Sequence, residues 1–581
     1  MSFKQHLDTL RLSAKEAIVD GEKNSFNELK TYLHIERPVE KDLSKLISHA
    51  ASSPLSSLIL VLGNVGDGKS HLLARMWQSH PELLKNFILC NDATESVYTN
   101  KTYLQNLAEV FAPYNDENID SRDHHTKTII AINLGTLTNF LEECPIGFNQ
   151  LKQYVAENHL VEQQIQQSEI AQHTHFFALN LTDYHIYSLS EEGARSDVLT
   201  DIIRKITAPV AHNPFHKAFQ STYAAHPEPL ACPLYYNYQL LNNSHVQTAV
   251  NSLLVKSIVT DKLIISVRLL MNLVYDLIVP PELSSMSDLE IKGKVLSAQF
   301  RSEFYKHTLP VILFESAATS SIFKSFVKLD PASDDNEELD EVIVKLSSAA
   351  EPGSYFQKFG ILTVDDALFA TLEKLGIKQR VQLFLRLSFI YNAFDLRKDE
   401  IFNSFIKYLL DYNRGNVRNL LPLYRMVSTA IYQWNGSTKL GADFINLDIG
   451  RKQGVYKVSR SLILEFVPFG VNPVRGNELN RFMDTLRLRF AVQNHGERYF
   501  ELEIDFLLFQ LVALVNKGYK PNRVDKDTQV KFSKFVNELI QYKSETKELT
   551  IQEFNGETRK KFKLTYTTGF NTFQFTRDDD F

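Results

Sequence analysis

Residues 57–77 read SLILVLGNVGDGKSHLLARMW, and the rest of the chain is interpreted from this stretch. The apolar residues at its start predict a buried strand, and the residues after the glycines predict a helix. Between the two, residues 63–70 have the pattern G-x-x-x-x-G-K-S, which is the spacing of a phosphate-binding loop, or P-loop. Because such a loop needs a strand before it and a helix after it, the context supports this interpretation.

The chemistry of the motif assigns a role to each part. Glycines let main-chain N–H groups approach phosphate oxygens, and the N-terminus of the following helix adds its positive dipole end. Lys69 is expected to contact the β- and γ-phosphates, and the Ser70 hydroxyl is expected to hold Mg²⁺. The sequence therefore predicts a binding site for ATP and Mg²⁺ made of Gly63, Asn64, Val65, Gly66, Asp67, Gly68, Lys69, Ser70 and His71.

Size and composition are those of a soluble globular protein. The chain has 581 residues, 44% of them hydrophobic and 23% charged, which fits about two or three domains. The net charge of −6 argues against a strongly basic body that binds nucleic acid, although it is compatible with a local basic patch. The three cysteines have no metal-ligand spacing and indicate a reducing compartment. Since no signal peptide or long apolar stretch is evident, we expect a cytoplasmic protein without a membrane span.

The pattern along the chain predicts an N-terminal helical segment followed by three domains. Residues 1–54 read as helical, and residues 55–280 alternate apolar runs with helical segments, as in an α/β layer architecture. Residues 281–450 read as helical again, and residues 451–581 read as a small α+β domain. The predicted fold class is thus an α/β P-loop NTPase core with a helical lid or middle region and a small α+β C-terminal domain.

Charged residues mark two further segments. The acidic run 329–340 is expected to be an exposed, solvated loop. In the C-terminal domain, Asn555-Gly556 is a strong signal for a β-hairpin. Basic residues give that domain a local positive character that is compatible with nucleic-acid binding, but solvated faces are the commoner explanation. These basic residues are Arg475, Arg481, Arg487, Arg489, Lys560 and Lys561.

Hydrolysis requires acidic residues that the sequence does not present in the usual form. A hydrolysing P-loop ATPase commonly has a second strand that ends in an acidic pair, one for Mg²⁺ and one for water. Asp92 and Glu95 follow the apolar run 87–90 and are the nearest such pair, with Asp92 as the candidate Mg²⁺ ligand. The next apolar run ends in Asn133 instead of an aspartate, and Asp183 is the next acidic candidate.

Two further positions are candidates for contact with the γ-phosphate. Asn180 or Thr182 follows the fourth apolar run, and ligands of open α/β sheets bind at the carboxyl ends of the strands. Arg268 lies near the start of a predicted helix over 264–279, where a lid arginine would stabilise charge in the transition state. The alternative for Arg268 is an ordinary surface arginine. The candidate catalytic residues are Lys69, Asp92, Glu95 and Arg268.

Several strings of the sequence carry a resemblance to a known family. They are GNVGDGKSHLL (63–73), NDATES (91–96), AINLGTL (131–137), NLTDYHIYSL (180–189) and VRLLMNLVYDLIVP (267–280). With these the chain resembles the DptF family, the ATPase subunits of the restriction module that accompanies bacterial DNA phosphorothioation. The resemblance covers the first half of the chain best and is weak over the last hundred residues.

The resemblance implies a role in bacterial defence. It implies a subunit that acts with two sister proteins on unmodified DNA, as a motor or a nucleotide-controlled switch, and that meets DNA directly or through those partners. A homo-oligomer is compatible with this role, and no membrane is involved. The family's nucleotide-binding residues fall on Gly63, Gly66, Gly68, Lys69 and Ser70.

Two alternatives stay open at this point. The missing acidic pair favours a module in which bound nucleotide fixes an assembly state without hydrolysis. A small-molecule kinase is the third class, but the length of the chain and its extra domains argue against it, because P-loop kinases are usually compact. Nothing in the sequence resembles a nuclease constellation.

Overall fold

The computed structural model divides the chain into two compact units. The first comprises residues 1–398 and 478–482, and the second comprises residues 399–477 and 483–581. The structure describes residues 1–12, 28–64, 67–90, 102–120, 125–143, 147–158, 160, 175–224, 228–333, 337–436, 443–447, 456–468, 473–474, 476–493, 498–542, 548–555, 558–567 and 572–577.

A parallel four-stranded sheet forms the part of the first unit that carries the glycine-rich motif. Its strands are β1 (Ser57–Leu62), β2 (Ile88–Cys90), β3 (Lys127–Ile132) and β4 (Phe176–Asn180), in the order β2-β3-β1-β4. All six residues of β1 are buried, as expected for a central parallel strand that is covered on both faces. The four strands predicted from the apolar runs are therefore confirmed.

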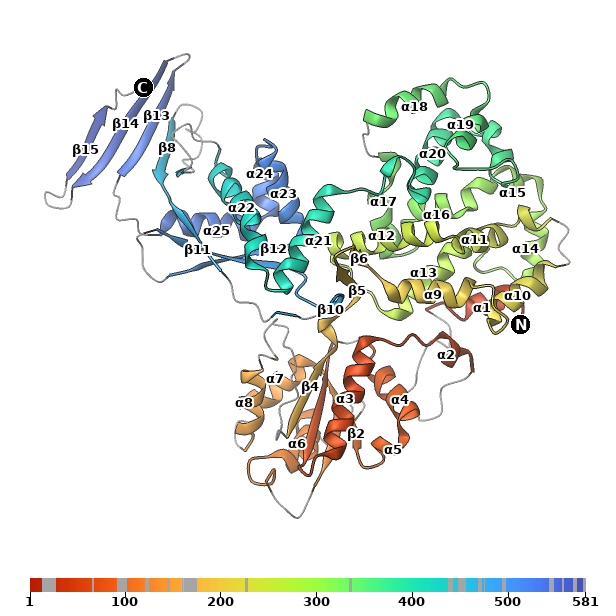
Figure 1. Ribbon diagram of the computed structural model, residues 1–581, viewed down its shortest axis with the longest axis horizontal. Helices are drawn as coiled ribbons and strands as arrows, with labels where there is room; N and C mark the ends of the chain where they lie inside the picture. The colour runs from red at the N-terminus through yellow and green to blue at the C-terminus, as the bar shows by residue number, and fades with distance from the viewer. Residues whose placement is uncertain are drawn as a thin grey trace. The chain divides into compact units, whose positions relative to one another are not determined.

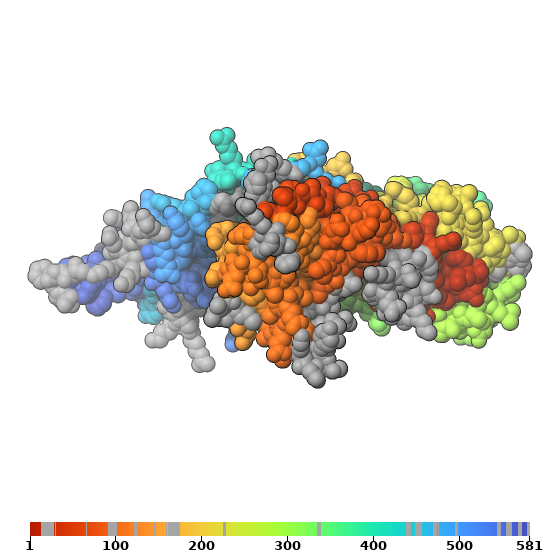
Figure 2. Space-filling model, turned by 90° about the horizontal axis from the view of Figure 1, so that it is seen from below, coloured from red at the N-terminus to blue at the C-terminus, as the bar shows by residue number. Residues whose placement is uncertain are grey.

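Helices cover both faces of this sheet (Figure 1). On one face, α3 (Pro38–Ser52) and α4 (Lys69–Ser79) pack against alternate residues of β1. On the other face, α6 (Tyr103–Phe111), α7 (Leu134–Glu143) and α8 (Asn149–Glu157) pack against the remaining ones. The result is a three-layer arrangement of the α/β class, and an α/β layer architecture is what the sequence predicts for residues 55–280. Figure 2 shows this part of the chain, coloured red to orange, as a continuous surface.

The remainder of the first unit is mostly helical and shares one hydrophobic core with the N-terminal helices. None of the helices in the described ranges is long and apolar enough to span a membrane. The helices of this remainder are α1 (Phe3–Asp8), α2 (Glu28–Leu33), α9 (Asp197–Thr207), α10 (Pro214–Tyr223), α11 (Pro233–Leu241), α12 (Ser244–Asp261), α13 (Val267–Ile278), α14 (Asp288–Val295), α15 (Ala298–Ser302), α16 (Leu309–Glu315), α17 (Ser321–Lys328), α18 (Glu337–Ser347), α19 (Pro352–Lys358) and α20 (Ile377–Tyr391). The short helix α5 (Pro81–Leu84) instead packs with α3 and α4 beside the parallel sheet.

A small antiparallel sheet in the first unit includes a strand from much later in the chain. It consists of β5 (Tyr184–Ser190), β6 (Gly193–Arg195) and β10 (Leu479–Arg481), in the order β10-β5-β6. The β10 strand pairs with β5, and the ring of Phe482 stacks on His185 with centroids 4.2 Å apart. The first unit is therefore completed by a short segment that is flanked on both sides by residues of the second unit.

The second unit combines helices with antiparallel sheets. One sheet has the order β12-β11-β9 and the other has the order β15-β14-β13-β8-β7. In the second sheet Asn555 lies opposite Thr558, which confirms the predicted hairpin. The elements are α21 (Glu400–Asn413), α22 (Leu421–Gln433), β7 (Phe444–Asn446), β8 (Tyr456–Ser461), β9 (Leu464–Val467), β11 (Leu486–Val492), β12 (Phe500–Ile504), α23 (Phe506–Asn516), α24 (Arg523–Thr528), α25 (Val530–Gln541), β13 (Glu548–Asn555), β14 (Thr558–Thr567) and β15 (Thr572–Arg577).

The acidic run 329–340, which its composition predicts to be solvated, is not solvated at all of its described residues. Asp330 is only 6% exposed and accepts hydrogen bonds from Nε and Nη2 of Arg386 at 3.2 and 2.7 Å. Glu315 accepts a further bond from the same guanidinium at 2.6 Å. From Glu337 the run continues as helix α18. The expectation of an exposed loop is therefore wrong at Asp330, whose charge serves a buried ion pair in the helical core.

Candidate functional site

The glycine-rich loop connects β1 to α4. Two of its glycines occupy positions that a residue with a side chain would not readily adopt. Gly68 adopts a left-handed conformation, with φ 87° and ψ 23°, and caps the N-terminus of α4. At Gly63, an added Cβ would lie 3.2 Å from Cβ of Leu181 and 3.0 Å from Oδ2 of Asp67. Within the loop, the N–H of Asn64 donates to the same carboxylate at 2.5 Å. The backbone therefore approaches its neighbours more closely than a side chain would allow.

Lys69 is the first residue of α4, and its ammonium group lies across the loop. Its Nζ donates to the carbonyl oxygens of Gly63 and Asn64 at 2.9 and 2.7 Å. It also donates to Oδ1 of Asn133 at 2.8 Å. Gly63 and Asn133 directly follow the neighbouring parallel strands β1 and β3, so the lysine is held at the carboxyl edge of the sheet. Sequence reasoning identified the lysine but missed Asn133 as its partner.

The next two residues of α4 differ in their surroundings. Ser70 is exposed in the first turn of the helix. The ring of His71 stacks on His34 with centroids 5.9 Å apart, and Nε2 of His34 lies 2.9 Å from Oε2 of Glu40. Burial, with a smaller contribution from the charges of His34 and Arg37, lowers the pKa of His71 to about 4. Its ring is therefore neutral at physiological pH.

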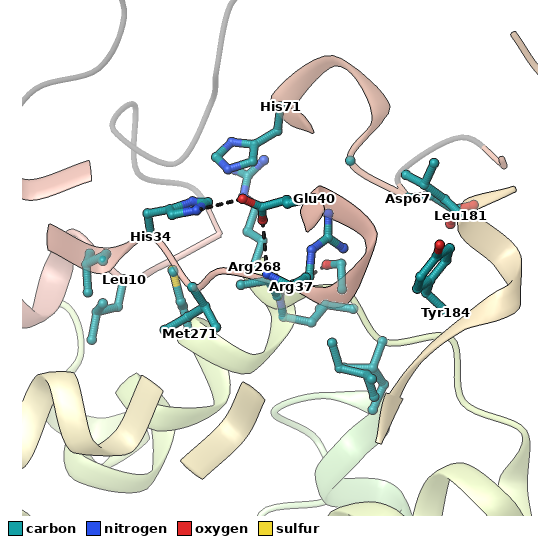
Figure 3. A pocket seen from close by; sticks show the side chains of 18 of the residues that line it. Leu10, His34, Arg37, Glu40, Asp67, His71, Leu181, Tyr184, Arg268 and Met271 are labelled. Carbon is teal, nitrogen blue, oxygen red and sulfur yellow. Dashed lines mark hydrogen bonds and ion pairs between the residues drawn. The ribbon is translucent and has the colours of Figure 1, made fainter. Parts of the chain in front are cut away.

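A cavity of about 610 Å³ opens beside the loop (Figure 3). This volume is within the usual range for a small-molecule or cofactor site. Charged and polar side chains, Arg37, Glu40, Asp67 and His71, line it near the start of α4. Its apolar part is lined by Leu29, Leu33, Ile35, Ile186, Ile265 and Met271. The cavity thus combines an apolar compartment with a charged rim next to the glycine-rich loop.

Arg37 contributes a positive charge to this rim that sequence reasoning missed. Its Nη2 lies 3.7 Å from the position that a Cβ on Gly68 would occupy. Burial lowers the pKa of its guanidinium, and the nearby charges of Glu40 and Asp67 oppose that shift. In the described part of the chain, no hydrogen bond or ion pair engages this guanidinium. A half-buried cation beside a helix N-terminus is therefore available to an anionic ligand.

Arg268, the predicted lid arginine, lines the same cavity from the first turn of α13. Its Nη2 donates to the carbonyl oxygen of Leu12, and its Nε is buried without a hydrogen-bond partner within the described residues. Ser266 caps this helix by accepting from the N–H of Leu269 at 3.3 Å. The structure therefore brings Arg268 to the cavity, with part of its guanidinium engaged by the N-terminal segment.

The polar residues at the end of β4 mainly bond with one another. Oδ1 of Asn180 accepts from the N–H and the hydroxyl of Thr182 at 3.2 and 2.9 Å, and its amide donates to Asp183 at 3.1 Å. Asp183 also forms an ion pair with Arg481 at 3.2 Å. Burial raises the pKa of Asp183, and the charge of Arg481 opposes that shift. These residues form a hydrogen-bonded turn next to the glycine-rich loop.

The remaining predicted residues fall on stretches that are not described. Val65 and Gly66 lie outside the described residues, as do Asp92 and Glu95. The β2 strand, which precedes the acidic pair, ends at Cys90 and runs parallel to β3. The chain therefore leaves β2 at the same edge of the sheet at which Lys69 is held. Whether either acid reaches the loop stays a prediction.

Comparison with protein-family models, with curated proteins and with solved structures gave no match. A role for this site is therefore inferred from its own geometry and from the sequence motif.

Proposed function

We propose that the chain binds ATP at the glycine-rich loop and hydrolyses it with Mg²⁺. The observation that carries the proposal is the position of the Lys69 ammonium, which three oxygen atoms hold between the ends of β1 and β3. A triphosphate at the N-terminus of α4 would supply phosphate oxygens in place of these carbonyl oxygens, at the positive end of the helix dipole.

The cavity beside the loop suits the rest of a nucleotide. Its apolar part would take the base, and Arg37 on its rim would contact the phosphates. Arg268 would add a second positive charge from α13. Since both arginines reach the cavity from outside the sheet, nucleotide binding would join the N-terminal helices and α13 to the loop.

The residues at the loop also fit a magnesium ion. The hydroxyl of Ser70 is exposed in the first turn of α4, next to Lys69, and Asp92 is the expected carboxylate ligand. Bound Mg²⁺ would neutralise charge on the β- and γ-phosphates. Lys69 would orient the γ-phosphate, and Asp92 with Glu95 would hold the ion and the attacking water.

One observation favours a second candidate, a nucleotide-dependent assembly module without hydrolysis. The side chain that meets Lys69 from the adjacent strand is Asn133, and a neutral amide cannot accept a proton from water as a carboxylate can. In that case ATP would act through the contacts that it makes with Arg37 and Arg268, and its occupancy would fix one arrangement of the first unit.

The cellular setting that we propose comes from the resemblance to the DptF family. The chain would be the ATPase of a bacterial defence complex that restricts DNA lacking phosphorothioate modification. It would act with its sister subunits as a motor or as a nucleotide-controlled switch, and it would meet DNA directly or through them.

Calorimetric titration of the full chain with Mg-ATP tests the binding site. Lys69→Ala should weaken binding at least about 100-fold, because it removes a charged partner of the phosphates. Lys85→Ala, at an exposed position after α5, is the matched control and should bind as the parent does. Equal heats for both variants would rule out the proposed site.

Phosphate release separates the two candidates. Turnover that disappears in Asp92→Asn, with binding of ATP retained, would establish hydrolysis and assign the acid. Binding without turnover, measured with modified and unmodified duplexes and with sister subunits, would leave the assembly module. If cells that carry Lys69→Ala still restrict unmodified DNA, the link between the site and defence fails.

A further inference from the structure

One face of the C-terminal hairpin sheet in the second unit is aromatic and exposed. Side chains alternate between the two faces along a strand, and residues directly opposite each other in an antiparallel pair share a face. Every residue of β15 is exposed. The facing pairs of β14 and β15 are Phe562 with Arg577, Leu564 with Phe575, and Tyr566 with Phe573.

The rings on this face form two close pairs at the surface, one stacked and one tilted by 49°. Phe562 and Phe575 are stacked with centroids 4.9 Å apart and ring planes 17° apart, and Tyr566 and Phe573 also have centroids 4.9 Å apart. Phe573 is 70% exposed and Phe575 is 56% exposed. Aromatic rings normally contribute to a fold by being buried. Rings left this open form a platform on which a planar ligand can stack.

Strands β14 and β15 carry only basic charges, in contrast to the whole chain, although Glu557 directly precedes them and three aspartates, 578–580, directly follow them in the sequence. Residues 558–577 contain five basic and no acidic residues, whereas the complete chain has a net charge of −6. Lys560 is on the aromatic face opposite Glu553 of β13, and Arg577 is on the same face opposite Phe562. Lys563, on the opposite face, forms an ion pair with Glu548 at 3.3 Å. The exposed rings are therefore bordered by cations, which favours an anionic partner.

We propose that this face binds single-stranded nucleic acid. Bases would stack on Phe573 and Phe575, and Lys560 and Arg577 would contact the phosphates. Rings two residues apart on a strand are separated by about 7 Å, roughly twice the rise of stacked bases, so each ring receives its own base. Flat aromatic platforms with flanking cations bind single strands in this way, whereas the paired bases of a duplex are not accessible to them.

This proposal is independent of the ATP site, because all of its residues belong to the second unit. It also assigns a function to Lys560, which sequence reasoning explained by default as part of a solvated face. The face would recognise bases and phosphates, and both groups are present in single-stranded DNA and in single-stranded RNA.

The test is fluorescence anisotropy of the full chain with labelled 20-nucleotide single-stranded DNA, the same sequence as RNA, and the duplex. We expect single strands to bind more tightly than duplex. The double change Phe573→Leu and Phe575→Leu should lower single-strand affinity at least about tenfold, since leucine keeps the apolar area but cannot stack. Tyr499→Leu, at a 50% exposed ring elsewhere in the second unit, is the control and should bind normally.

Charge and oligomeric state complete the test. The double change Lys560→Gln and Arg577→Gln should reduce the slope of log affinity against log salt by about 1.4, roughly 0.7 for each phosphate contact in a single strand. Lys531→Gln, an exposed lysine of α25, should not change it. Duplex binding equal to single-strand binding, or unchanged affinity in the leucine variant, overturns the proposal. A dimer that sedimentation detects in the parent and that the leucine variant loses would overturn it in favour of a protein interface.

Discussion

Replacing Arg37 with methionine removes a positive charge beside the glycine-rich loop while keeping an unbranched apolar side chain at the position. Because no hydrogen bond or ion pair in the described residues engages the guanidinium, the change leaves no broken ion pair behind. The fold should therefore tolerate it. What is lost is the attraction between this cation and the phosphates of a bound nucleotide.

The size of the loss follows from the position of the guanidinium. Its Nη2 is 3.7 Å from a Cβ placed on Gly68, the cap of α4, so it would reach the same phosphates as the helix N-terminus. A hydrogen bond to a charged group contributes about 1.5–3 kcal/mol. In addition, Glu40 and Asp67, whose charges Arg37 now opposes, would repel the nucleotide once it is gone. We expect a loss of about 2 kcal/mol, or roughly 30-fold in Kd for ATP.

Calorimetric titrations with ATP, ADP and adenosine check this reasoning. The Arg37→Met variant should lose affinity for ATP and ADP but bind adenosine as the parent chain does, because adenosine has no phosphate. Arg204→Met, an exposed arginine of α9, serves as the control. If ATP affinity changes by less than about twofold, or if adenosine loses as much as ATP, Arg37 does not face the phosphates and the proposed orientation of the nucleotide is wrong.

Three further predictions concern ionisable side chains inside the first unit. In each case the measurement is the melting temperature of that unit. Burial raises the pKa of Asp276 to about 7, so its stabilising effect is complete below pH 4 and is lost as the pH rises to 7. Asp276→Asn should therefore raise the melting temperature at pH 8 and leave it unchanged at pH 4. Since the pKa of His71 is lowered to about 4, its contribution is present above pH 6.5 and is lost as the pH falls toward 4. His71→Gln should make the melting temperature depend less on pH between 6.5 and 4. An unaltered pH dependence in this variant would contradict the prediction. Asp330→Ala should cost about 3–5 kcal/mol by leaving Arg386 buried without one of its partners. Glu341→Ala, which removes a fully exposed ion pair, is the control and should leave the melting temperature nearly unchanged.

The parts of the fold that the sequence predicts are those encoded locally. The strand, loop and helix of residues 57–77 are specified by consecutive residues, and the four parallel strands follow from apolar runs that each end in polar residues. The hairpin at Asn555 was likewise predictable from a turn signal of two residues. Each of these features can be predicted without knowing which distant segments become neighbours in the fold.

The parts that the sequence does not predict depend on contacts between distant segments. Asn133 could be recognised as the partner of Lys69 only once the strand order placed β3 beside β1. Arg37 precedes a proline at the start of α3, and nothing in its local sequence indicates that it reaches the loop. Asp330 lies in an acidic run, and only the fold brings Arg386, 56 residues later, to pair with it.

The strand β10 limits how the protein can be divided. Residues 478–482 belong to the first unit although residues on both sides of them belong to the second, so the backbone crosses from one unit to the other three times. A chain ended at Lys398 would lack the strand that pairs with the edge of β5, and it would leave Asp183 without Arg481. The first unit is therefore not an independent contiguous module, and we expect such a truncation to aggregate unless residues 478–482 are supplied through a linker.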